Sequence, residues 1–94
     1  MQLSADDITN ISRIAQKHGA VKVSLFGSFA RGDAQPSSDV DILVEFESGR
    51  TLLDLIRLER ELEELLNTGV DVLTPNSLHP RIRERVMKET VPVL

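Results

Sequence analysis

The sequence contains no cysteine, no tyrosine and no tryptophan. Without cysteine the chain forms no disulfide and binds no metal through thiolates, which excludes zinc sites of that kind. Its three phenylalanines are too few for the stacked aromatic platforms that hold single-stranded nucleic acid. It also lacks a run of about 18 apolar residues, the length that a membrane-spanning helix needs. We therefore expect neither a membrane nor direct contact with nucleic acid.

Positive charge is scarce as well. Lys and Arg total 11 against 15 Asp and Glu, so the formal net charge is −4, whereas a dedicated nucleic-acid binder usually carries a basic face. Residues 1–7 contain no basic residue and no apolar run, unlike the basic and apolar start of a secretory signal. These features predict a cytoplasmic protein that forms a single domain over residues 1–94.

Apolar residues recur at spacings that switch between helix and strand along the chain. Spacings of three and four predict helices over 4–18, 51–67 and 80–89, and a short helical turn over 28–31. Alternation predicts strands over 21–26, 39–46 and 70–73, while 91–94 adds an edge segment or docks loosely. This order predicts an α/β (α+β) fold in which helices flank a small sheet. It leaves open which strands pair parallel and which pair antiparallel.

Two carboxylates interrupt the strand predicted over 39–46. Side chains alternate across a strand, so Asp39 and Asp41 point to one face with Cα atoms ~6.5–7 Å apart. Their neighbours in the strand are apolar, and two anions in such surroundings repel each other and lose hydration. An isolated Asp-x-Asp is more often a solvated edge, but the apolar flank favours a divalent cation here. Leu43 occupies the next ligand position of a calcium loop, which excludes that motif.

A Gly-Ser turn follows the first predicted strand. The backbone N–H groups of Gly27 and Ser28 suit a phosphate group at the start of a helix, although these residues also form ordinary strand-to-helix turns. A P-loop is excluded because Asp33 and Ala34 stand where it requires Lys and Ser or Thr. Asp71, on the third predicted strand, either faces solvent or joins the other two carboxylates. In the second case the oxygen ligands suit Mg²⁺ or Mn²⁺.

The combined motif resembles the polymerase-β-like nucleotidyltransferase superfamily. It consists of five residues in order: Gly27, Ser28, Asp39, Asp41 and Asp71. Segments 26–32 and 38–44 look like the minimal nucleotidyltransferase (MNT) branch, and the resemblance covers nearly the whole chain. It implies a nucleotidyltransferase-like fold, a small mixed sheet with flanking helices.

The resemblance also assigns roles to these residues. It implies a catalytic triad that binds two Mg²⁺ ions, formed by Asp39, Asp41 and Asp71. It implies that Gly27 and Ser28 hold the β- and γ-phosphates of ATP, and that the third carboxylate could act as the base. Arg31 resembles the arginine of the branch's Ala-Arg-Gly motif, and either contact with phosphate or pairing with a carboxylate is compatible with it.

Members of this branch that resemble the chain are typically antitoxins encoded beside a HEPN-domain RNase toxin. Some transfer AMP from ATP to a toxin tyrosine, and a chain without tyrosine fits a target in another protein. The alternative is a non-catalytic antitoxin that neutralises the toxin by binding alone. Transfer to a small molecule is less favoured because no acceptor domain is present. A second copy of the chain or the toxin would complete the pocket, giving a homodimer or a hetero-oligomer.

The other charged residues have simpler interpretations. His18 and His79 lack metal-ligand spacing, and we expect both at the surface. The basic run 81–88 is typical of a solvated face, or of a surface that attracts RNA or an acidic partner. In helix 51–67 the leucines predict a core stripe and the glutamates, Glu59 and Glu63 among them, a solvent-facing side. Apolar width beyond that stripe could support a protein contact.

Overall fold

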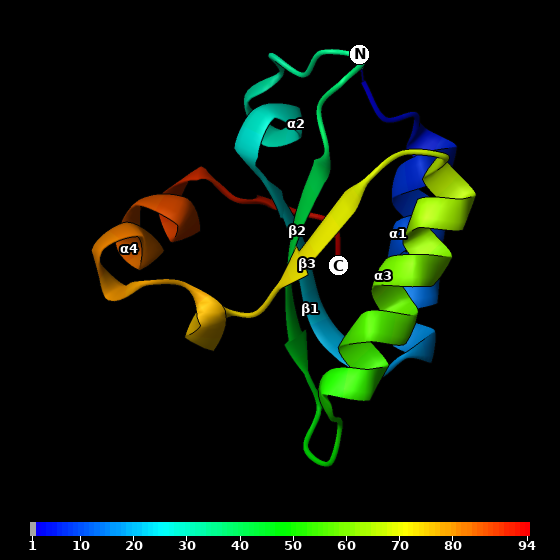
Figure 1. Cartoon of the computed structure of the whole chain (residues 1–94), viewed down its shortest axis with the longest axis vertical. Coiled ribbons are helices and arrows are strands. Elements are labelled where there is room, and N and C mark those ends of the chain that lie inside the picture. Colours follow the sequence, from blue (N-terminus) through cyan, green and yellow to red (C-terminus); the bar gives the residue numbers. More distant parts are fainter. Residues whose placement is uncertain (1) are drawn as a thin grey trace.

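Four strands form one sheet in the computed structural model, which describes residues 2–94 (Figure 1). The strands are β1 (Ala20–Phe26), β2 (Val40–Phe46), β3 (Val70–Leu73) and β4 (Val91–Pro92), and they lie in the order β3-β2-β1-β4. β1 pairs antiparallel with both β2 and β4, whereas β2 pairs parallel with β3. The sheet is therefore mixed, as the resemblance implied, and the C-terminal tail adds an edge strand.

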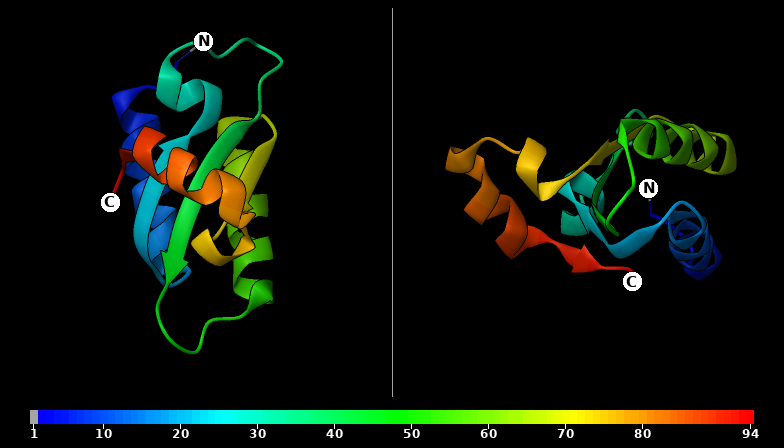
Figure 2. Two further views of the ribbon diagram at one scale, coloured as in Figure 1. Left: turned by 90° about the vertical axis from the view of Figure 1, so that its left-hand side faces the viewer. Right: turned by 90° about the horizontal axis from the view of Figure 1, so that it is seen from below.

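The helices lie on both faces of this sheet. They are α1 (Ala5–Lys17), α2 (Gly27–Arg31), α3 (Leu52–Leu66) and α4 (Pro80–Glu89), with a 3₁₀ turn, η1 (Pro75–Ser77), before α4. α1 and α3 lie side by side on one face, and α4 crosses the other (Figures 1 and 2). The bounds confirm the helices predicted from the sequence. Within residues 2–94, none of these helices is long and apolar enough to cross a membrane.

Local hydrogen bonds fix where the two long helices begin. The Ser4 hydroxyl accepts from the Asp7 backbone N–H at 3.0 Å, and the Ser4 N–H donates to the Asp7 carboxylate at 3.1 Å. The Thr51 N–H donates in the same way to the Asp54 carboxylate at 2.7 Å. Such reciprocal bonds satisfy backbone donors that a helix start leaves free. They explain why α1 and α3 start at these residues.

Strand alternation gives the sheet two different faces. The apolar face packs under α1 and α3 and is formed by Val23, Leu25, Val40, Ile42, Val44, Val70 and Val72, all buried. The polar face, which α4 crosses, is formed by the alternate residues Lys22, Ser24, Phe26, Asp41, Leu43, Glu45, Asp71 and Leu73. Ile11, Leu58 and Leu62 complete the core from the helix side. The core therefore lies on one side of the sheet, and the carboxylates lie on the other.

One histidine differs from the expectation. His18 is not a surface residue, since its side chain is only 16% exposed and its Nε2 lies 3.6 Å from the Glu61 carboxylate of α3. It caps the end of α1, where packing between α1 and α3 covers it. His79 is exposed as expected, and its Nδ1 accepts from the Arg81 backbone N–H at 3.1 Å, which caps α4.

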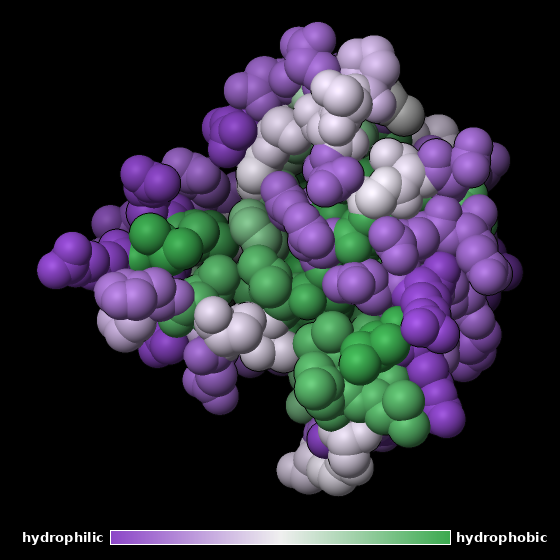
Figure 3. All heavy atoms as spheres, in the orientation of Figure 1, coloured by the Kyte–Doolittle hydropathy of each residue, from purple (hydrophilic) through white to green (hydrophobic). Residues whose placement is uncertain are grey.

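The first turns of α3 carry an exposed apolar patch, formed by Leu52, Leu53 and Ile56. Their exposed fractions are 70%, 51% and 39%, and Figure 3 shows an apolar area over the start of this helix. The patch provides the apolar width beyond the core stripe that the sequence indicated. Leu58 and Leu62, further along α3, are fully buried.

Candidate active site

The parallel pairing of β2 and β3 brings two of the predicted carboxylates together. Asp41 and Asp71 are direct partners in the register, where both strands begin, and both lie on the polar face. Asp39 immediately precedes β2 rather than lying within it, and it is exposed. The Val40 N–H donates to the Gly69 carbonyl at 2.9 Å, so the ladder starts beside Asp39. All three carboxylates thus lie at one end of two neighbouring strands.

Mutual repulsion acts on the central carboxylate. Partial burial raises the pKa of Asp41 above its ordinary value, as do the charge of Asp71, a hydrogen bond with Asp71 and the charge of Asp39. The positive charge of Arg31 opposes these effects. Carboxylates that share a site disfavour each other's ionised form. A cation between them would remove this repulsion.

The side chains are not yet arranged as a ligand set. Among residues 2–94, no group of three or more His, Asp or Glu residues is placed to hold a metal ion as the side chains stand. The positions nevertheless fit one, because the register makes Asp41 and Asp71 neighbours and the repulsion at Asp41 favours a cation. Oxygen-only ligands of this kind suit Mg²⁺. Binding would require the side chains to turn toward a common point.

Two glycines make room for the carboxylates. Gly27 has a left-handed backbone, with φ of +70°, and a Cβ there would overlap the Asp41 carboxylate. A Cβ at Gly69 would overlap the Asp39 carboxylate in the same way. Gly27 was predicted as a site residue, whereas Gly69 was not. A glycine directly before the third strand was the signal in the sequence that could have indicated it.

The predicted Gly-Ser turn opens α2 directly beside Asp41. β1 ends at Phe26, which pairs with Asp41 in the register, and the helix begins at the next residue. The Ser28 carbonyl accepts from the N–H groups of Gly32 and Asp33 at 3.0 and 3.1 Å, which closes this short helix. Ser28 therefore follows the glycine at which a Cβ would overlap the Asp41 carboxylate.

Arg31 pairs with carboxylates in this structure. Its Nε lies 3.3 Å from the Asp33 carboxylate, and its Nη1 lies 4.0 Å from that of Glu89 on α4. Its charge also acts on Asp41, so the guanidinium lies close to the carboxylate site. Pairing with a carboxylate is one of the two contacts that the sequence allowed, and contact with phosphate stays a prediction. Arg31 links α2 to α4 across the polar face.

Two glutamates support β3 at its outer edge, although the sequence predicted that they face solvent. The Glu63 carboxylate accepts from the Val70 N–H at 3.3 Å, and the Glu59 carboxylate accepts from the Val72 N–H at 3.0 Å. These N–H groups flank Asp71. Four helical residues rise about 6 Å, which matches two strand residues of about 6.6 Å. The four-residue spacing of the glutamates on a helix that faces an edge strand was the signal in the sequence that could have indicated these hydrogen bonds.

Comparison with known proteins gives a consistent picture. The family described as "Nucleotidyltransferase domain" matches residues 8–93. A Methanocaldococcus jannaschii protein named "Putative protein adenylyltransferase" is 54% identical over 81 residues, which cover 86% of this chain and 87% of that protein. "Protein adenylyltransferase MntA" of Thermococcus cleftensis is 42% identical over 78 residues, which cover 83% of this chain and 79% of that protein.

Solved structures agree with the sequence comparison. One named "Structure of putative minimal nucleotidyltransferase" has a TM-score of 0.85 and 47% identity, covering 93% of this chain and 89% of that chain. A toxin–antitoxin with AMP-PNP is more distant, with a TM-score of 0.80 and 20% identity over 93% and 72% of the two chains. A complex of tri-AMPylated Shewanella oneidensis HEPN toxin and MNT antitoxin has a TM-score of 0.72 and 18% identity. The match covers 94% of this chain and 69% of that chain. These last two show the shared fold.

Proposed function

This chain belongs to the nucleotidyltransferase domain family, and we propose that it is an antitoxin that transfers AMP from ATP to a tyrosine of a HEPN-domain toxin. Relatives named as protein adenylyltransferases support the transfer of AMP to a protein. A toxin–antitoxin with AMP-PNP and an AMPylated HEPN toxin bound to an MNT antitoxin are structural neighbours that support the substrate and the partner. The chain itself has no tyrosine, which fits a tyrosine acceptor in another protein.

The observation that carries this proposal is the register between β2 and β3. It pairs Asp41 with Asp71 beside Asp39, although a long helix separates the two strands in the sequence. The cluster does not stabilise the fold, because partial burial and then repulsion by the neighbouring carboxylates raise the pKa of Asp41. A glycine turn with space for the Asp41 carboxylate lies next to it. An acidic cluster beside such a turn suits a triphosphate bound through metal ions.

The residues that would hold the metal are the same three carboxylates. We propose that Asp39, Asp41 and Asp71 bind two Mg²⁺ ions, for which oxygen ligands and substrate phosphates are the usual partners. Bound there, the metal supplies charge stabilisation for in-line displacement at phosphorus. The three carboxylates would hold that charge beside the turn at Gly27 and Ser28.

Residues of the chain itself then bind and orient the phosphates and accept a proton. Backbone N–H groups of Gly27 and Ser28 hold the β- and γ-phosphates, and Arg31 adds positive charge from α2. Asp71 accepts the proton of the acceptor hydroxyl. The hydroxyl oxygen bonds to the α-phosphorus while the bond from that phosphorus to the oxygen bridging the β-phosphate breaks. Pyrophosphate leaves, and AMP remains on the acceptor.

Co-expression with a cognate HEPN-domain toxin tests the proposal. The mass of that protein should rise by whole AMP units, and α-labelled ATP should label it in the presence of Mg²⁺. The double variant Asp39→Ala/Asp41→Ala should abolish labelling, whereas Asp6→Ala/Glu64→Ala, which removes two exposed carboxylates elsewhere, should not. Undiminished labelling by the first variant would disprove the mechanism.

The second candidate function is neutralisation by binding alone. The exposed apolar patch of Leu52, Leu53 and Ile56 favours a protein contact that needs no catalysis. In that case the partner's mass stays unchanged, and the double variant still neutralises the toxin. A toxin growth assay alongside the mass measurement therefore separates the two functions.

A further inference from the structure

A cavity of about 300 Å³ opens on the polar face, and its lining includes Ser24 and Leu43, the pair that follows Phe26 and Asp41 along β1 and β2 on that face. The sheet contributes Ser24 and Leu43 to its lining, α4 contributes Met87, and the C-terminal segment contributes Pro92. The comparisons and the site described above assign nothing to this cavity. Its place on the sheet and its chemistry both bear on how a nucleotide would lie.

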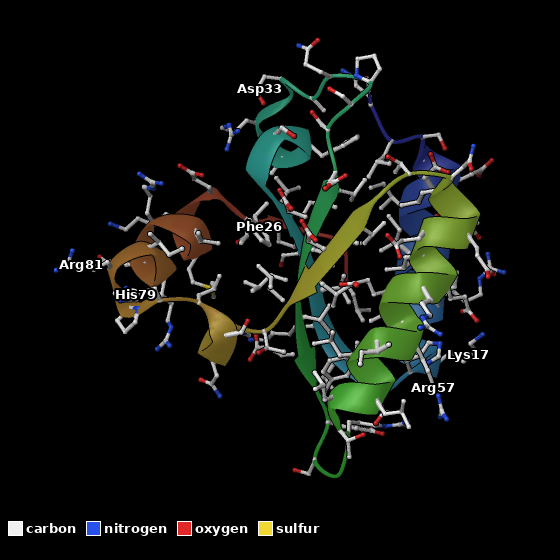
Figure 4. The ribbon with its side chains drawn as sticks, viewed as in Figure 1. Lys17, Phe26, Asp33, Arg57, His79 and Arg81 are labelled. Carbon is white, nitrogen blue, oxygen red and sulfur yellow. The ribbon has the colours of Figure 1, made fainter. Side chains whose placement is uncertain are left out.

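The cavity adjoins the carboxylate site in the strand register. Asp41 pairs with Phe26, and the next pair on the same face is Leu43 with Ser24. Residues two apart along a strand lie about 7 Å from each other. Figure 4 shows Phe26 on the side of the sheet that faces α4. A ligand held at Asp41 that extends along the strands away from the Gly27 turn would therefore enter this cavity.

The lining combines apolar walls with a polar edge. Leu43 is buried in the sheet, and Met87 faces the cavity from α4. Ser24 supplies a hydroxyl, and at the exposed side the Glu45 carboxylate lies 4.0 Å from the Lys22 ammonium. Pockets for small ligands typically have apolar walls and a few polar groups that fix the ligand's orientation. A flat ring with nitrogen atoms at its edge matches this lining.

We propose that this cavity holds the purine base of the nucleotide, an inference that rests on the proposed function. The β- and γ-phosphates lie at the Gly27 turn, and the α-phosphate lies beside Asp41. The ribose lies between Asp41 and the next residue pair on this face, Ser24 with Leu43. The base packs between Leu43 and Met87. The Ser24 hydroxyl bonds a ring nitrogen, and the Glu45 carboxylate accepts from an exocyclic amino group.

Calorimetry with the full chain in the presence of magnesium tests the base site. ATP and inorganic triphosphate are the two probes, because they share the phosphates and differ in the nucleoside. Ser24→Leu fills the cavity, so ATP should bind at least about tenfold more weakly, a change of about 1.4 kcal/mol. Binding of inorganic triphosphate should not change.

A matched control exists on another part of the surface. Ser12 lines a separate cavity of about 310 Å³ formed by α1 and Val93, so Ser12→Leu makes the same exchange in a space of equal size. It should leave the affinity for both probes unchanged. Met87→Ala provides a second variant that removes one wall at an exposed position, and it should weaken ATP binding while triphosphate binding remains.

Each alternative outcome has a distinct reading. Equal weakening of both probes by Ser24→Leu, or no change in ATP binding with either cavity variant, overturns the base site. A raised KM for the protein acceptor with unchanged ATP affinity overturns it too, and assigns the cavity to the acceptor side chain. If wild-type protein binds ATP only as tightly as triphosphate, the base has no site here. Absence of binding by both probes contradicts the proposed function itself.

Discussion

Under α1 and α3 the sheet presents Val23, Ile42 and Val44, all fully buried, whereas its opposite face presents Ser24, Asp41 and their polar neighbours from the same strands. The two faces alternate residue by residue, so one strand supplies both. Burial of aliphatic side chains stabilises the first face. Carboxylates that repel each other occupy the second. Stability and chemistry are thus separated by the direction in which a side chain points, and substitutions should affect them separately.

The largest expected effect is on the apolar face. Leu58→Ala removes a fully buried side chain, and such changes cost about 2–5 kcal/mol of unfolding free energy. Urea denaturation measures this loss. Leu53→Ala, on the same helix but 51% exposed, should cost far less. Similar losses for both variants would contradict the assignment of the core to one side of α3.

Gly27→Ala should affect the polar face more than the fold. The left-handed backbone at this position costs a side chain about 1–2 kcal/mol, and the new methyl group overlaps the Asp41 carboxylate. Gly49→Ala is the control, since Gly49 is also left-handed, with φ of +89°, but nothing lies near its added Cβ. Both variants should lose similar stability by denaturation. Only Gly27→Ala should lose nucleotide affinity. Equal nucleotide affinities of the two variants would contradict a role for the close approach between Gly27 and the Asp41 carboxylate.

The sequence predicted local features well and long-range contacts poorly. Ser4 with Asp7 indicated the start of α1, because capping involves residues three apart. The pairing of Asp41 with Asp71 could not be derived from local patterns, since the parallel register depends on how α3 packs between them. Family resemblance, rather than spacing, indicated it. The structure then placed the carboxylates together without yet forming a complete ligand set.

The errors also have physical causes. Glu59 and Glu63 were expected to face solvent because they are charged, but each accepts a backbone hydrogen bond from β3. His18 was expected at the surface because it ends a helix, but the packing of α1 against α3 covers it. Charge predicts exposure only where no unpaired backbone donor or neighbouring helix lies within reach.

A smaller effect is expected from the hydrogen bonds by which α3 supports the outer edge of β3. Glu59→Ala leaves the Val72 N–H without its carboxylate acceptor, and a hydrogen bond of this kind contributes about 0.5–1.5 kcal/mol. Amide hydrogen exchange at Val72 should accelerate, and turnover should fall because the strand that carries Asp71 loosens. Glu59→Gln keeps an acceptor oxygen, so it should restore much of the exchange protection at Val72 and much of the turnover. The exposed Glu64→Ala should change neither, and equal effects would contradict the inference.

The smallest expected effect is the pH dependence of stability. Because the folded state raises the pKa of Asp41, its stabilising contribution is complete below the ordinary value of 3.8 and is lost as the pH rises through the raised pKa. In EDTA, the Tm of wild type should therefore fall relative to that of Asp41→Asn as the pH rises above this ordinary value and through the raised pKa. Thermal scans measure this difference. Adding Mg²⁺ should raise the wild-type Tm and not that of the variant, and parallel curves would contradict the repulsion.

The hydrogen bonds that the Glu59 and Glu63 carboxylates accept from β3 have a consequence for how this chain can associate with others. An edge strand with free N–H groups can recruit a strand from another molecule. Here those donors on β3 are occupied, and the opposite edge is a two-residue strand that ends in Pro92. Neither border of the sheet is a good template for strand addition. Assembly is therefore directed toward the helices and the polar face, and growth into extended β-aggregates is disfavoured.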